Sequence, residues 1–119
     1  MNISTAWFAG TPEAEREKRA LAGLALLDEK YGPDKVNAMD LERLDVRWNA
    51  DCPLGQVSGV GYNAALSQVG LKDDYVAKPL GLYPVGSSEL RRTDDAQRLT
   101  AIFRRKINER RAARGGIAA

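Results

Sequence analysis

The chain of 119 residues is long enough for a single domain, and its 44% apolar and 29% charged residues are typical of a globular protein. It has no histidine and one cysteine, which excludes a serine–histidine–aspartate triad, a cysteine–histidine dyad, a histidine–cysteine zinc site and an intrachain disulfide. The net charge of +2 hides an uneven distribution, because residues 91–114 hold nine basic and three acidic residues, a local charge of +6.

The first ten residues form an apolar-leaning arm that contains Trp7 and Phe8. Two aromatic residues so near a terminus are typical of a segment that docks on the body of the protein or on a partner chain. The chain does not open with a basic region followed by an apolar one, and no stretch is apolar enough to span a membrane. We therefore expect a cytoplasmic protein with no signal peptide and no membrane contact.

A helix is predicted over 12–31. Thr11 is a good N-cap, and Pro12 suits the first helical position because its missing N–H costs nothing there. Apolar residues recur at helical spacing and should form one buried stripe: Ala20, Leu24, Leu27 and Tyr31. Gly32 followed by Pro33 should end the helix.

The next segment, 34–48, is less regular. Asp40 is placed to cap a short helix over 41–45, and a strand is the alternative. The segment 49–71 has no lysine or arginine and keeps a helical period of apolar residues through three glycines. This pattern predicts a central, largely buried helix over 53–69, with a kink near 59–61.

Residues 72–88 contain proline and glycine and should form a loop with one helical turn near 74–78, or a short β pair within 72–86. The last helix is predicted over 94–112, with Thr93 as its N-cap, and its apolar stripe is formed by Ala96, Leu99, Ile102, Phe103 and Ile107. The fold class is therefore mostly α. We expect a single-domain bundle of three main helices plus a short one, with a helical body over 12–112 and a tail over 113–119.

Four patterns invite a chemical interpretation, and each has a stronger structural one. Cys52 should be a buried apolar residue, because no histidine is present to activate it. The run Gly59–Ala64 fits a loose dinucleotide-binding pattern but keeps helical period where a strand is required. A helix-turn-helix over 54–69 would lack basic residues in its second helix. The acid pairs Asp73–Asp74 and Asp94–Asp95 should cap helices or lie in loops, so we expect no metal and no cofactor.

The basic run near the C-terminus has two interpretations. It could bind phosphate through four arginines, Arg104, Arg105, Arg110 and Arg111. It could equally be a solvated helix face, with cations placed favourably at the negative end of the helix dipole.

Several short segments, among them 40–46, 52–57, Gly61–Tyr62 and 69–71, together with Arg110–Arg111, resemble a family of small proteins of uncharacterised function. These proteins occur in actinobacteria and their phages, including mycobacteriophages. The resemblance covers residues 17–111. It implies an actinobacterial or phage origin and a mostly helical domain, and it brings no established activity with it.

The sequence thus favours a non-enzymatic interaction or regulatory protein that binds a host or phage protein. The alternative is a nucleic-acid-binding protein that uses the basic helix 94–112. Homo-oligomer formation through the glycine-rich segment or through the arm with Trp7 and Phe8 remains open.

Overall fold

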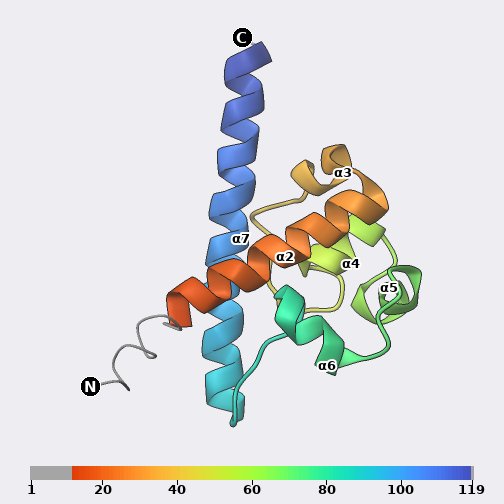
Figure 1. The fold of residues 1–119 in the computed structure, drawn as a ribbon, viewed down its shortest axis with the longest axis vertical. Helices are drawn as coiled ribbons and strands as arrows, with labels where there is room; N and C mark the ends of the chain where they lie inside the picture. Colours follow the sequence, from red (N-terminus) through yellow and green to blue (C-terminus); the bar gives the residue numbers. More distant parts are fainter. Residues whose placement is uncertain (1–11, 119) are drawn as a thin grey trace.

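Two long helices, α2 (Pro12–Tyr31) and α7 (Glu89–Ala118), form the framework of the protein. The structure is a computed structural model and describes residues 12–118. Helix α2 crosses the long α7, and the short helices gather beside these two (Figure 1). All regular secondary structure in this range is helical, which confirms the predicted mostly α class. The predicted arm with Trp7 and Phe8 lies outside the described residues.

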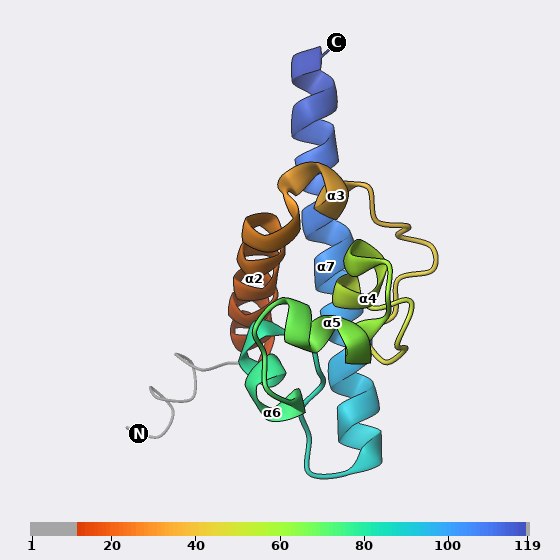
Figure 2. The same ribbon diagram turned by 90° about the vertical axis from the view of Figure 1, so that its right-hand side faces the viewer.

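The two long helices are connected by five short elements. They are α3 (Pro33–Asn37), α4 (Pro53–Ser58), α5 (Tyr62–Gln68), α6 (Asp74–Ala77) and the 3₁₀ helix η1 (Lys78–Leu80). Helix α2 contacts α3, α4, η1 and α7, so it packs against both the short elements and the other long helix. The C-terminal end of α7 extends beyond the other helices in both views (Figure 2).

The core lies where α2, α4 and α7 meet. Its largest fully buried side chains include Leu27, Leu54, Leu99, Phe103 and Ile107. The apolar stripes predicted for the first and last helices are buried here, apart from a partly exposed Tyr31. The helix predicted over 12–31 is confirmed, and Gly32 ends it with a φ of +92°, a conformation that glycine adopts without strain.

The prediction of a short helix over 41–45 is wrong. Asp40 does begin a turn, because its carboxylate accepts hydrogen bonds from the N–H groups of Glu42 and Arg43. The turn does not continue as a helix, since the carbonyls of Leu41 and Leu44 bind the guanidinium group of Arg104 instead. The short helix in this part of the chain is α3, which starts earlier at Pro33.

The single central helix predicted over 53–69 is also wrong, because the chain forms two helices, α4 and α5. The break falls at the predicted kink. Gly59 and Gly61 adopt φ values of +77° and +87°, which a continuous helix cannot accommodate. Gly59 therefore marks the end of one helix and Gly61 the start of the next, whereas Gly55 lies within α4.

The last helix is longer than predicted at both ends. It begins at Glu89, and the Ser88 side chain accepts a hydrogen bond from the N–H of Arg91, so Thr93 is not its N-cap. The expected tail over 113–119 is helical as far as Ala118. The helical turn predicted near 74–78 is confirmed as α6, and the alternative β pair is absent from residues 72–86.

Candidate functional site

A pocket of about 420 Å³ lies where four segments of the chain meet. These segments are the loop 46–52, the first turn of α5, the loop 82–84 and the first turn of α7, and α6 contributes one residue. We name it the Trp48 pocket after the aromatic residue at its edge. The side chains that matter for its chemistry are Trp48, Tyr62, Asp74, Tyr83, Glu89 and Arg92. Its volume is in the range of pockets that bind small molecules or single side chains.

The aromatic residues of the pocket differ in exposure. Trp48 is 56% exposed, whereas Tyr62 is only 7% exposed. The Tyr62 and Tyr83 rings lie 5.8 Å apart between centroids, a normal distance for a packed aromatic pair. The guanidinium carbon of Arg47 lies 5.3 Å from the centroid of the Trp48 ring. The tyrosines thus form an ordered wall, and Trp48 presents apolar surface to solvent.

The Tyr62 hydroxyl donates a hydrogen bond to the Asp74 carboxylate over 2.8 Å. Burial, together with this bond to an anion, raises the pKa of Tyr62. The phenol therefore stays protonated at neutral pH and donates its proton to the hydrogen bond with Asp74. The contact fixes α6 against the start of α5 and places one carboxylate in the pocket.

Asn49 holds the loop of Trp48 against α5. Its backbone carbonyl accepts a hydrogen bond from the N–H of Tyr62 over 2.8 Å, and its side-chain oxygen accepts one from the N–H of Asn63 over 2.9 Å. Cys52, at the base of the same loop, is the N-cap of α4 and accepts a hydrogen bond from the N–H of Gly55. The loop is therefore fixed in its middle and at its C-terminal end.

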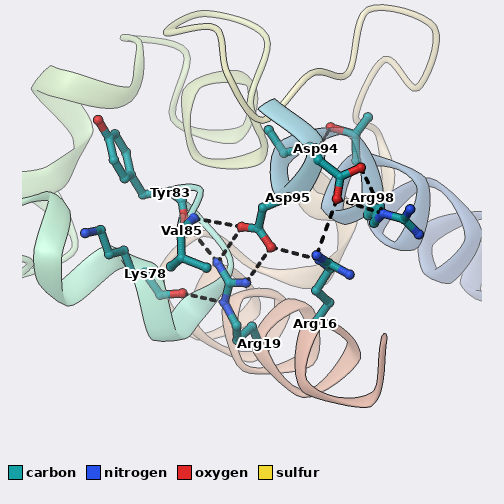
Figure 3. A network of polar contacts seen from close by, with 10 residues as sticks. Arg16, Arg19, Lys78, Tyr83, Val85, Asp94, Asp95 and Arg98 are labelled. Atoms are coloured by element: carbon teal, nitrogen blue, oxygen red, sulfur yellow. Dashed lines mark hydrogen bonds and ion pairs between the residues drawn. The ribbon is translucent and has the colours of Figure 1, made fainter. Parts of the chain in front are cut away.

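The wall segment 82–84 is held by a buried ion-pair network (Figure 3). The Arg19 guanidinium binds both carboxylate oxygens of Asp95 and also donates to the carbonyls of Lys78 and Tyr83. Asp95 accepts a further hydrogen bond from the N–H of Val85 over 2.8 Å. One arginine of α2 and one aspartate of α7 thus fix the backbone on both sides of Pro84.

Asp95 remains ionised in this network. Burial alone would raise the pKa of its carboxyl group, but hydrogen bonds from Arg19, the Val85 N–H and Arg16 outweigh that effect. The net result is a pKa below the ordinary value of 3.8. The network is therefore a permanent structural element at neutral pH.

The four arginines predicted to bind phosphate are all in contact with the body of the protein. Arg104 donates to the carbonyls of Leu41 and Leu44, and Arg111 donates to those of Asn37 and Met39. Arg110 pairs with Asp28, with 2.7 Å between nitrogen and oxygen, and Arg105 lies within 4.0 Å of two glutamates. Arg104 and Arg111 thus contact the segment 37–44, whereas Arg105 and Arg110 contact α2. Trp7 and Phe8 lie outside the described residues.

The other candidate residues have structural roles. Cys52 is buried as expected, and burial raises the pKa of its thiol to about 11. Asp73 caps α6, in agreement with the prediction for that pair. The cap predicted for Asp94 and Asp95 is wrong, since both lie inside α7.

Of the residues that line the Trp48 pocket, only Cys52 and Asp74 were candidates from the sequence, because the lining comes from separate segments of the chain. One signal was available in the sequence. Trp48 stands between Arg47 and Asn49, and an aromatic residue in a polar run often remains at the surface. Nothing in the sequence indicates that Tyr62, Tyr83 and Glu89 would lie around the same hollow.

No known protein family, curated protein or solved structure matches the chain. Among residues 12–118, histidine, cysteine, aspartate and glutamate do not cluster in a way that could hold a metal ion. Over the same range, every helix is too short or too polar to cross a membrane.

Proposed function

We propose that this protein is a non-enzymatic binding module that recognises a protein partner through the Trp48 pocket. The observation that supports the proposal is the exposure of Trp48 at the edge of a hollow with an ordered aromatic wall. Tryptophan is highly buried on average in folded proteins, and it is enriched at protein interfaces and among the residues that dominate binding energy.

The pocket chemistry favours binding over catalysis. The Cys52 thiol and the Tyr62 phenol are protonated at neutral pH, so neither is an activated nucleophile or base. The Asp74 carboxylate already accepts a hydrogen bond from the Tyr62 hydroxyl. These groups support recognition of a side chain and do not form the nucleophile–base arrangement that group transfer requires.

The alternative is nucleic-acid binding through the basic helix. Its arginines donate hydrogen bonds to backbone carbonyls or pair with carboxylates of the body, and binding phosphate would compete with those contacts. A nucleic-acid-binding surface usually presents unpaired cations on one face. We therefore place the protein-binding function first and keep the alternative as an outcome of the experiment.

The proposal extends to the setting of the protein. From the short sequence segments that resemble small actinobacterial and phage proteins, we further propose a host or phage protein as the partner and the cytoplasm as the site of action. A second copy of the chain is a further candidate partner, which size-exclusion chromatography with light scattering would reveal.

The test is a comparative pull-down from an actinobacterial lysate with tagged wild type, Trp48→Ala and Val60→Ala. Val60 is 50% exposed and does not line the pocket, so it controls for the loss of exposed apolar surface. Each lysate is divided into nuclease-treated and untreated halves. We expect one protein to be captured in both halves by wild type and Val60→Ala and to be lost with Trp48→Ala.

Capture that is unchanged by Trp48→Ala would overturn the proposed site. Capture that disappears after nuclease treatment would favour the nucleic-acid alternative. In that case, replacing Arg104, Arg105, Arg110 and Arg111 with glutamine should abolish it.

A further inference from the structure

Two carboxylates of the Trp48 pocket have no cationic partner among the residues that the structure describes. Asp74 and Glu89 both line the pocket, and within residues 12–118 neither forms an ion pair. The only side-chain partner of Asp74 there is the uncharged Tyr62 hydroxyl. Carboxylates beside an aromatic wall create a local negative potential at a site that a ligand could desolvate.

Two arginines also line the pocket, and their contacts decide the charge balance. Arg47 pairs with Asp45, with 3.3 Å between nitrogen and oxygen, so its charge is already matched. Arg92 donates a hydrogen bond to the carbonyl of Gly86 over 3.2 Å and forms no ion pair within the described range. The unpaired charges are therefore two anions and one cation, which favours a cationic ligand.

The aromatic residues favour the same ligand. The faces of tryptophan and tyrosine attract cations, and the pocket already contains one example, the Arg47 guanidinium beside the Trp48 ring. Arginine and lysine also have long aliphatic stems that pack well on aromatic surface. A basic side chain would thus contact an aromatic wall along its stem and a carboxylate at its end.

We propose that the Trp48 pocket receives a basic side chain, arginine or lysine, from an exposed segment of the partner protein. This inference rests on the proposed binding function and adds the chemistry of the occupant. Its charged end is recognised by Asp74 and Glu89, and its stem lies against Trp48 and Tyr83. An acidic side chain would face the two unpaired carboxylates, and an apolar one would desolvate them without compensation.

The experiment is an NMR titration of the ¹⁵N-labelled full-length chain with three capped tripeptides, Ala-Arg-Ala, Ala-Gln-Ala and Ala-Glu-Ala. We expect the arginine probe to shift the indole signal of Trp48 and the amide signals of Asn63 and Thr93. Its affinity should exceed that of the glutamine probe by about tenfold, because only the arginine probe forms charge-assisted hydrogen bonds. Added salt should weaken the binding of the arginine probe.

Two variants identify the carboxylates, and a third is the control. Glu89→Gln and Asp74→Asn should each weaken the arginine probe by about three- to tenfold. Glu29→Gln removes an exposed carboxylate of α2 that does not line the pocket and should leave the affinity unchanged. If Asp74→Asn disturbs the fold through Tyr62, the exposed Glu89 still tests the inference, and the spectrum of each variant reports its folding.

Equal binding of the arginine and glutamine probes, preference for the glutamate probe, or no pocket shifts at millimolar concentrations of the arginine probe would each overturn the inference. None of these results affects the pull-down, which depends on Trp48 and not on the charge of the occupant. Conversely, a partner that Trp48→Ala still captures would overturn the proposed function, even if the arginine probe binds as expected.

Discussion

The Arg19 guanidinium and the Asp95 carboxylate form a two-point contact across the α2–α7 interface, with nitrogen–oxygen distances of 3.0 and 3.1 Å. Both residues are buried, with exposures of 8% and 3%. Arg19 also binds the carbonyl of Tyr83, and Asp95 binds the N–H of Val85 (Figure 3). The pair therefore joins the two long helices and fixes one wall of the Trp48 pocket.

Replacement of Asp95 by asparagine should lower the free energy of unfolding by about 3–5 kcal/mol, because it leaves Arg16 and Arg19 without their buried counter-charge. Urea unfolding followed by circular dichroism measures this loss. The neighbouring Asp94→Asn is a matched control, since Asp94 is half exposed and its ion pairs with Arg98 and, at 3.7 Å, with Arg16 should contribute under about 1 kcal/mol each. Equal effects of the two substitutions would contradict the role assigned to Asp95.

The stabilisation by Asp95 should depend on pH in a defined direction. Its folded-state pKa lies below the ordinary value of 3.8, so the ionised group stabilises the folded state above that pH. The contribution is lost as the pH falls from 3.8 through the lower folded-state pKa. The difference in unfolding free energy between wild type and Asp95→Asn should thus be constant near neutrality and shrink below about pH 4. A difference that grows on acidification would refute this assignment.

The Cys52 thiol should be unreactive in the folded protein. Its pKa of about 11 leaves about one thiolate per thousand molecules at pH 8, and the side chain is 1% exposed. Ellman's reagent should therefore react slowly with the native protein and at once after unfolding in guanidinium chloride. Rapid reaction of the native protein would show that the loop 46–52 opens readily.

Gly23→Ala should destabilise the protein, although alanine is the better helix former. A methyl group at this position in α2 would lie 2.1 Å from the carbonyl oxygen of Leu80, so η1 would have to move away. We expect a loss of about 1–3 kcal/mol in a thermal unfolding experiment, in place of the usual gain of about 1 kcal/mol. Ala25→Gly, on the exposed side of the same helix, should show the ordinary propensity cost. A rise in Tm for Gly23→Ala would show that α2 and η1 are not tightly packed.

The sequence predicted the long helices well because their apolar periodicity is local. The stripe from Ala96 to Ile107 is buried as expected. The sequence does not predict the first turn of α7, because residues 89–93 have no apolar stripe. The N-terminal cap of this helix is Ser88, whose side chain accepts a hydrogen bond from the N–H of Arg91. The helical spacing of apolar residues in 53–69 does correspond to helix, but the positive φ values of Gly59 and Gly61 divide this segment into two helices.

The candidate site was largely unpredictable because it depends on contacts between distant parts of the chain. The carbonyls of Leu41 and Leu44 bind Arg104, about sixty residues later, and this contact replaces the predicted helix over 41–45. Likewise, Asp95 was predicted as a capping residue, since its partner Arg19 is 76 residues away. Local patterns cannot identify such partners.

The position of the core residues along the chain also has a consequence for synthesis. Leu99, Phe103 and Ile107 are all supplied by α7, which leaves the ribosome after every other described helix. A nascent chain that ends before α7 would expose the apolar side of α2 and lack Asp95, the counter-ion of Arg19. Folding therefore waits for the synthesis of α7, and until then the chain exposes apolar surface of the kind that makes folding intermediates prone to aggregate.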